Sequence, residues 1–327
     1  MKKIYDVAAL GELLVDFTMN GNTEQGNLLF EANPGGAPCN VLSMLQKLGN
    51  QTAFIGKVGD DSFGEMLREV VAEMGINISN LVMDGEVPTT LAFVHTAMDG
   101  DRSFTFYRNP GADMMLTEAD VEKSKDLIRS CKIFHFGTLS MTDERCDKAT
   151  KKAIELAEEA NAVISFDSNL RLPLWNDLGV AKKKIAYGIS KSHILKISDD
   201  EIIFFTGNSD IDEGVARLQE QYHIPLIFVT MGNRGSRAYY DKCIVDCPPF
   251  LNETTIETTG AGDTFMACVL NGILQYGLDG LDKQKLYDML EFANAAASII
   301  TTRKGALRVM PEEEEVRNFI QERQTGN

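Results

Sequence analysis

A glycine turn that ends in an aspartate is the part of the sequence best suited to chemistry. It reads "ETTGAGDTF" over residues 257–265, and an apolar run with helical spacing follows it. Gly260, Ala261 and Gly262 are therefore predicted at the start of a helix, where backbone N–H groups lack intrahelical partners and the helix dipole is positive. Because these residues carry no large side chains, an anion such as phosphate can lie directly on the amides.

Asp263 is an unexpected neighbour for a phosphate, because a carboxylate repels it. The side chain makes sense as a general base that takes the proton from an incoming hydroxyl group. A base beside an anion hole is the arrangement needed to transfer a phosphoryl group to an alcohol. The alternative is that Asp263 only caps the helix, and this stretch by itself does not separate the two readings.

A second glycine motif, "PGGAPCN", spans residues 34–40. Gly35 and Gly36 precede a predicted helix and let the backbone approach a ligand. Asn40 lies on the first turn of that helix and offers both a donor and an acceptor to a sugar hydroxyl. An ordinary turn with a helix cap explains the same residues.

A third motif, "TMGNRGS", spans residues 230–236. Gly232 and Gly235 follow an apolar strand directly. Ligands of open α/β sheets bind at this carboxyl edge of the strands, so the turn is a candidate binding site. Alone, it is a weak signal.

The elements that must position these motifs alternate along the chain. Amphipathic helical patterns separate short, almost continuously apolar runs, which predict strands covered on both faces. This alternation predicts parallel βαβ units, and hence an α/β fold with helices on both sides of a mostly parallel sheet. The predicted strands are residues 6–10, 52–59, 131–137, 162–167, 193–198 and 226–232.

Two segments depart from the alternation. Residues 89–108 alternate around Asp99-Gly100, which is a strong hairpin signal. The earlier segment, roughly residues 11–33, is rich in Gly and Asn and lacks a helical period. Segments of roughly 11–33 and 88–110 are therefore predicted to form a small antiparallel sheet apart from the main sheet, attached as a lid.

Composition limits the function classes. The 327 residues carry a formal net charge of −16, which argues against nucleic acids and anionic membranes as partners. No run approaches the length of a membrane span. The six cysteines are scattered and no secretion signal is evident, which indicates a reduced, cytoplasmic protein. We interpret residues 1–327 as one domain.

The motifs together resemble the ribokinase-like sugar kinases of the PfkB family. "PGGAPCN" with "FIGKVGDDSFG" is similar to the N-terminal signature of that family, and "ETTGAGDTF" is similar to the C-terminal one. Within the family, "FTFYRNPGAD", "SFDSNLRLPLW" and "ILKISDDE" look most like bacterial fructokinases. The resemblance covers nearly the whole chain and implies a three-layer α/β/α domain with a small β-sheet lid.

The resemblance also implies roles for individual residues. Asp263 would be the catalytic base, and the amides of Gly260, Ala261 and Gly262 would form the anion hole. The residues implied on the sugar side are Asp16, Gly35, Gly36, Asn40, Phe106, Arg108 and Arg171. Those implied on the ATP side are Lys196, Ser198, Thr230, Gly232, Gly235, Gly262 and Asn294.

Two metal positions are implied with departures from the family pattern. Glu201 would act on Mg²⁺ through water, although Ser198 stands where the family motif has Asn. Glu257 would support a monovalent cation such as K⁺, although the family usually has Asp there. His135 has no metal-binding spacing with the other histidines, so we expect a packed, non-catalytic role for it.

The function implied is an ATP-dependent kinase that converts D-fructose to fructose 6-phosphate. Related substrates remain open: 2-keto-3-deoxygluconate, ribose or a nucleoside. A homodimer through the lid is also implied. A NAD-type oxidoreductase would need GxGxxG after the first strand, where this chain has "GELLVDF". A non-catalytic sugar sensor would most simply lack the base, which is present.

Overall fold

The computed structural model describes residues 2–96, 102–252 and 254–325. A nine-stranded sheet lies at its centre, in the order β13-β12-β11-β10-β9-β8-β1-β4-β5. Neighbouring strands are parallel except at β11–β12 and β12–β13. The strands are β1 (Tyr5–Leu10), β4 (Thr52–Gly59), β5 (Asn77–Asp84), β8 (Cys131–Gly137), β9 (Val163–Asp167), β10 (Ile194–Ser198), β11 (Leu226–Thr230), β12 (Ser236–Tyr240) and β13 (Cys243–Cys247).

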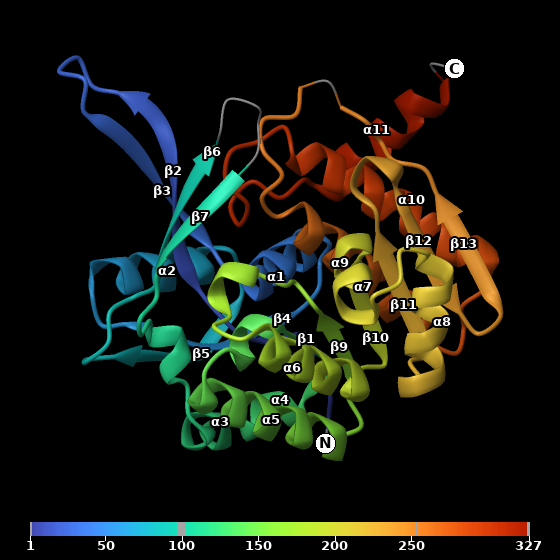
Figure 1. Ribbon diagram of the computed structural model, residues 1–327, viewed down its shortest axis with the longest axis horizontal. Coiled ribbons are helices and arrows are strands. Elements are labelled where there is room, and N and C mark those ends of the chain that lie inside the picture. The colour runs from blue at the N-terminus through green and yellow to red at the C-terminus, as the bar shows by residue number, and fades with distance from the viewer. Residues whose placement is uncertain (1, 97–101, 253, 326–327) are drawn as a thin grey trace.

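Helices cover both faces of this sheet, which confirms the predicted three-layer α/β arrangement (Figure 1). One apolar cluster joins the sheet to α1 (Ala37–Lys47), α2 (Ser62–Glu73), α9 (Ala261–Tyr276), α10 (Lys283–Ile300) and α11 (Glu313–Thr325). The other cluster joins it to α3 (Glu118–Lys123), α4 (Lys125–Arg129), α5 (Glu144–Glu159), α6 (Leu178–Lys191), α7 (Asp199–Thr206) and α8 (Ile211–Tyr222). Short 3-10 helices are η1 (Ala112–Met115), η2 (Thr138–Met141), η3 (Leu172–Leu174) and η4 (Gly232–Arg234).

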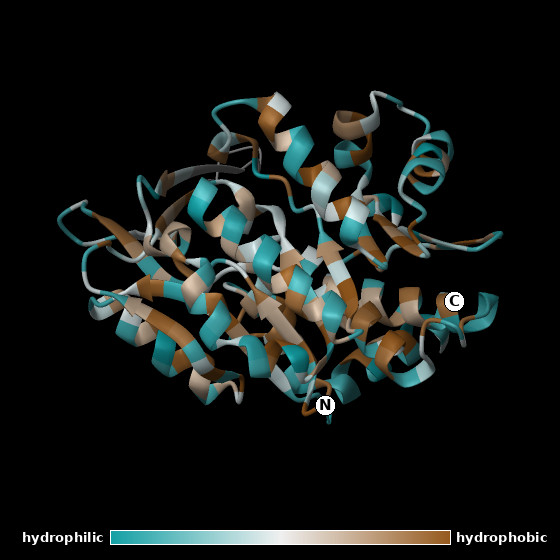
Figure 2. Ribbon diagram, turned by 90° about the horizontal axis from the view of Figure 1, so that it is seen from below, coloured by the Kyte–Doolittle hydropathy of each residue, from teal (hydrophilic) through white to brown (hydrophobic). Residues whose placement is uncertain are grey.

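The strand sequence explains the two layers. In β1, Val7 and Ala9 pack into one cluster, and Ala8 and Leu10 pack into the other. Because successive side chains point to opposite faces, a strand buried on both faces must be apolar throughout. Figure 2 shows the surrounding helices banded in teal and brown, as amphipathic helices on such a sheet should be.

A separate four-stranded sheet, in the order β3-β2-β6-β7, projects from the main body (Figure 1). Its strands are β2 (Leu14–Asn22), β3 (Leu28–Gly35), β6 (Leu91–Thr96) and β7 (Arg102–Tyr107). Strands β6 and β7 pair antiparallel, and the turn predicted at Asp99-Gly100 lies outside the described residues.

The prediction that this sheet is wholly antiparallel is wrong, because β2 and β6 are parallel. The connectivity gives the reason. Strand β2 follows β1, and β6 follows β5, and the parallel strands of the main sheet end at the same edge. Both excursions therefore leave that edge in the same direction.

Candidate active site

The glycine turn has the backbone conformation that its sequence predicts. Gly260 is the N-cap of α9 and has a left-handed φ of 77°. A Cβ atom there would lie 2.7 Å from the Cβ of Ala306, so a larger residue is excluded by both conformation and space. Helix α9 begins at Ala261, and the first amides of a helix have no partners within the helix itself. The N–H of Ala261 donates a hydrogen bond of 3.3 Å to the carbonyl oxygen of Thr258, in the loop before the helix.

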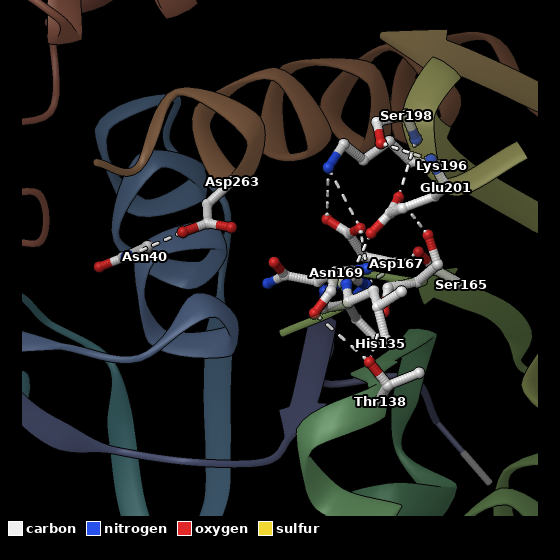
Figure 3. Close-up of polar contacts among 12 residues, drawn as sticks. Asn40, His135, Thr138, Ser165, Asp167, Asn169, Lys196, Ser198, Glu201 and Asp263 are labelled. Carbon is white, nitrogen blue, oxygen red and sulfur yellow. Dashed lines mark hydrogen bonds and ion pairs between the residues drawn. The ribbon is translucent and has the colours of Figure 1, made fainter. Parts of the chain in front are cut away.

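Asp263 lies on the first turn of α9 and is 9% exposed. Its Oδ2 accepts a hydrogen bond of 2.8 Å from Nδ2 of Asn40, a side chain on α1 (Figure 3). Burial raises the pKa of Asp263, although Asn40, Lys196 and Arg171 oppose the shift. A carboxylate with a raised proton affinity is a better general base than an ordinary aspartate.

A polar cavity of about 360 Å³ opens in front of this carboxylate. Its wall brings together residues from β2, α1, β7, α9 and the loop after β9. The predicted sugar-side residues in this wall are Asp16, Gly36, Asn40, Phe106 and Arg171. The turn residues Gly260, Gly262 and Asp263 line it as well.

Two predicted sugar-side residues lie elsewhere. Gly35 packs against Asp16, because a Cβ on Gly35 would lie 2.2 Å from Oδ2 of that residue. Arg108 is buried in an ion pair of 2.6 Å with Asp113 and is not among the residues of the cavity wall. The sequence placed Arg108 near the end of a lid strand but did not reveal a buried acid five residues later.

The cavity also holds two acids with raised pKa values. Burial raises the pKa of Asp16 to about 7; the nearby charges of Glu257 and Asp263 add to this effect and Arg171 opposes it. Burial likewise raises the pKa of Glu12 to about 7. Glu12 accepts a hydrogen bond of 2.9 Å from the backbone N–H of Ala37, at the start of α1.

Sequence reasoning missed two of the residues that line this cavity, Glu12 and Asn169. The Asn169 side chain extends toward Asp263 and Asn40 in Figure 3. Its backbone φ of 32° is left-handed. A signal for both existed, since Glu12 lies in the same "GELLVDF" as Asp16 and Asn169 lies two residues before Arg171.

Lys196 brings a positive charge beneath the glycine turn. Its Nζ forms a buried ion pair of 3.0 Å with Asp167, and a Cβ on Gly262 would lie 3.0 Å from the same nitrogen. Burial opposes the charge on Lys196, yet Asp167, Glu201 and Asp263 raise its pKa. The ammonium group can therefore stay charged beside the glycine turn.

Neighbouring His135 is buried, with Nδ1 3.0 Å from Oγ of Ser165. Burial, with the charge of Lys196, lowers the pKa of His135 to about 3. The ring is therefore neutral at ordinary pH, and it contacts a serine inside the sheet. This placement suits the packed role expected for it.

A second cavity, of about 410 Å³, adjoins the first. Gly262 and Thr258 line both. Five residues predicted on the nucleotide side lie in the second wall: Thr230, Gly232, Gly235, Gly262 and Asn294. Lys196 and Ser198, also predicted there, line the first cavity instead. The second wall is more apolar, with Phe250, Leu251, Phe265 and Ala297.

The two predicted metal positions have different surroundings. Glu201 lines the first cavity, and its carboxylate accepts hydrogen bonds from Ser168 Oγ (2.5 Å), Leu170 N (2.6 Å) and Ser198 N (2.8 Å). Glu257 is buried, and its carboxylate accepts a hydrogen bond of 2.9 Å from the backbone N–H of Gly305. Within residues 2–96, 102–252 and 254–325, no group of three or more His, Cys, Asp or Glu residues could hold a metal ion by itself.

The fold and the site define a class of protein. A buried carboxylate faces a polar cavity, a glycine turn at a helix N-terminus lies beside it, and a more apolar cavity adjoins on the other side. This is the arrangement of a phosphotransferase that acts on an alcohol. Comparison with known proteins then gives the family.

Residues 5–313 match the model of the pfkB family of carbohydrate kinases. The chain belongs to this family, as its two signatures predict, and it is a sugar kinase that transfers a phosphoryl group to a sugar hydroxyl. It is 39% identical to a probable fructokinase-4 of Arabidopsis thaliana, over 96% of each chain.

Solved structures agree with this assignment. A fructokinase from Xylella fastidiosa with bound ATP has a TM-score of 0.88 and 29% identity, over 98% of this chain and 100% of that one. A fructokinase double mutant from Vibrio cholerae O395, with fructose, ADP and potassium ion bound, has a TM-score of 0.86 and 26% identity, over 98% and 99%. The ribokinase-like fold predicted from the sequence is confirmed.

Among the described helices, none has the length and apolar character needed to cross a membrane.

Proposed function

We propose that this sugar kinase transfers the γ-phosphoryl group of ATP to D-fructose and releases fructose 6-phosphate and ADP. The observation that carries the chemistry is the hydrogen-bonded, buried Asp263 on the first turn of α9, where the polar and apolar cavities meet. The similarity to fructokinases over almost the whole chain supports fructose as the acceptor.

Asp263 takes the proton from the sugar hydroxyl in this mechanism. The hydroxyl oxygen attacks the γ-phosphorus, and the bond from that phosphorus to the bridging β–γ oxygen breaks, so that ADP leaves. The amides of Gly260, Ala261 and Gly262, with the nearby ammonium of Lys196, bind the charge on the transferring group.

The polar cavity would hold the sugar. Asp16, Asn40 and Arg171 supply donors and acceptors for hydroxyl groups, and Phe106 closes one side. The Oδ1 atom of Asn40 is buried and has no hydrogen-bond partner among the residues that the structure describes, which suits an acceptor for a sugar hydroxyl. Gly36, at the start of α1, has a φ of 124°, and a Cβ there would lie 2.4 Å from the carbonyl oxygen of Glu12, so the chain needs glycine at this point of the cavity wall.

The more apolar cavity would hold adenine beside Asn294, with the phosphates directed along Thr230, Gly232 and Gly235 to Gly262. Bound Mg²⁺ would neutralise phosphate charge, with Glu201 and Ser198 acting through water. Glu201 fits this role because its carboxylate lines the cavity while backbone and hydroxyl donors fix its position.

Glu257 would support K⁺ together with backbone oxygens near Gly305, which its carboxylate already contacts. Replacing K⁺ by tetramethylammonium in the kinase assay tests this role. Unchanged turnover would remove the potassium proposal and leave the sugar kinase untouched.

We also propose that β2, β3, β6 and β7 act as a lid over the sugar, within one kinase domain, and that two copies pair through it. Exposed Met19, Leu28, Leu29 and Tyr107 on this sheet support an apolar contact. All six cysteines are free thiols, which supports a reducing compartment such as the cytoplasm.

The decisive experiment is a coupled assay of ADP release with purified protein and a panel of acceptors: fructose, ribose, 2-keto-3-deoxygluconate, adenosine and glucose. We expect the highest kcat/KM with fructose. Strong turnover only with another acceptor would show that the proposed sugar is wrong while the kinase chemistry stands.

A further inference from the structure

One carboxylate anchors both strands of the β6–β7 hairpin. Arg108 directly follows β7, and its Nε donates a hydrogen bond of 2.8 Å to Oδ2 of Asp113. Thr90 directly precedes β6, and its hydroxyl donates 2.5 Å to Oδ1 of the same residue. The side chains of Arg108 and Asp113 are only 3% and 2% exposed. The root of the hairpin is therefore a buried, charged junction.

The same arginine joins this root to the main body. Nη1 of Arg108 donates a hydrogen bond of 2.8 Å to Oγ1 of Thr142, and Nη2 donates one of 3.1 Å to the carbonyl oxygen of Leu139. Leu139 lies in η2, which follows strand β8 of the large sheet. The guanidinium group thus connects the small sheet to the large one in a fixed orientation.

Tight packing fixes the geometry further. A Cβ on Gly111 would lie 1.8 Å from the Thr90 hydroxyl, so the chain between Arg108 and Asp113 must pass directly over Thr90. The backbone N–H of Ala112 also donates 2.9 Å to the carbonyl oxygen of Pro88. Neither strand can move at its root without breaking these contacts.

The junction lies next to the sugar cavity. Phe106, two residues before Arg108, lines that cavity and pairs in register with Ala92, two residues after Thr90. The carboxylate therefore holds the chain on both sides of the strand pair that carries Phe106. The charges of Arg108 and Asp113 also act on Glu12, another residue of the cavity wall.

We infer that Asp113 is a positioning residue for the sugar: it fixes the β6–β7 hairpin through Thr90 and Arg108, so that Phe106 closes the cavity over the acceptor. The inference rests on the proposed sugar site. Stability alone is a weak reason for such a junction, because a buried ion pair is often no more stabilising than apolar residues of the same volume.

The test uses Asp113→Asn and a milder matched pair, Thr90→Val and Thr90→Ser. Thr90→Val keeps the shape but removes the hydroxyl bonded to Asp113, whereas Thr90→Ser keeps that hydroxyl. Asp6→Asn is the control, because Asp6 forms an ion pair with Lys132 at the start of β1, the opposite end of the strand from the cavity. Each variant is assayed for the KM of sugar and of ATP, sugar-independent ATP hydrolysis and melting temperature.

We expect Asp113→Asn and Thr90→Val to raise the sugar KM by about tenfold or more, within the loss that a misplaced group can cause. The ATP KM should change less than about twofold, and the ratio of hydrolysis to sugar phosphorylation should rise. Thr90→Ser should restore wild-type values, and Asp6→Asn should leave both KM values unchanged.

A fall in melting temperature with unchanged sugar KM in Asp113→Asn and Thr90→Val would overturn the inference. So would an equal rise in the KM of sugar and of ATP. If Asp113→Asn does not fold, the comparison of Thr90→Val with Thr90→Ser tests the inference by itself. A wild-type protein inactive on fructose would contradict the proposed substrate only, and the same comparison would then use the sugar that is phosphorylated.

Discussion

At the scale of single residues, the carboxylate of Asp263 is surrounded by groups of both charges. Asn40 donates a hydrogen bond to it, while Lys196 and Arg171 favour its charged form and burial opposes it. The negative charge of Asp263 helps to raise the pKa of the neighbouring acid, Asp16. Two carboxyl groups in one cavity thus have different surroundings, as an acid–base site requires.

Asp263→Ala should slow phosphoryl transfer by orders of magnitude while nucleotide binding persists, because the second cavity does not include this side chain. Loss of a general base lowers turnover by about 10²–10⁴-fold. Steady-state kinetics and calorimetric titration with ADP measure the two properties. Near-wild-type turnover in the variant would contradict the role of Asp263.

Asp16 makes stability depend on pH in a direction that can be worked out. Its folded pKa of about 7 exceeds the ordinary 3.8, so between these values the folded protein keeps a proton that the unfolded chain has lost. Stability from this group therefore falls as pH rises through that window. Asp16→Asn does not titrate, so above about pH 7 its melting temperature should exceed that of the wild type.

The difference between the two melting temperatures should shrink as the pH falls toward about 4, where Asp16 is protonated in the folded protein. Thermal melts across this range provide the measurement. A difference independent of pH would show that Asp16 stays charged in the folded state.

At the scale of elements, helix α1 is capped from a distant part of the chain. Its N-cap, Gly36, has no side chain, and the carboxylate of Glu12 accepts the hydrogen bond from Ala37 N instead. The same helix carries Asn40, which holds Asp263. The cap, the helix and the base are therefore linked through α1.

Glu12→Ala should lower the free energy of unfolding by about 1 kcal/mol, as loss of a helix cap does, and it should also lower kcat. The matched control is Asp177→Ala, which removes the N-cap of α6 on the other face of the sheet. Denaturant unfolding and kinase kinetics compare the two. Equal kcat values for both variants would show that α1 does not transmit the effect.

At the scale of the whole molecule, the small sheet projects from the main body (Figure 1). It carries exposed apolar side chains. Leu28 is 59% exposed and Tyr107 is 64% exposed. A chain with a net charge of −16 otherwise repels its copies. The proposed contact between two copies through this sheet would cover these side chains.

We expect the wild-type protein to sediment as a dimer, and the double variant Leu28→Glu, Leu29→Glu to sediment as a monomer. The added charges would be buried without partners in the proposed contact, which is costly. Sedimentation velocity at several concentrations measures the change. A wild-type monomer at every concentration would rule out the contact.

The sequence by itself determined the fold class and the glycine turn before Asp263. Both depend on local patterns: apolar runs of strand length predict the sheet, and small residues before a helix predict free amides. Asn40 and Asp16 were also accessible, because short motifs of the family contain them. These features need no knowledge of which distant segments meet.

Only the tertiary structure decided which partners the long charged side chains contact. Arg108 was expected at the sugar but pairs with Asp113, and Glu12 was overlooked although it caps α1. The parallel pairing of β2 with β6 was likewise hidden. Each outcome depends on which elements become neighbours at the carboxyl edge of the sheet. Even Asp113, only five residues after Arg108, is its partner because the fold buries both side chains together, and a buried charge needs a partner.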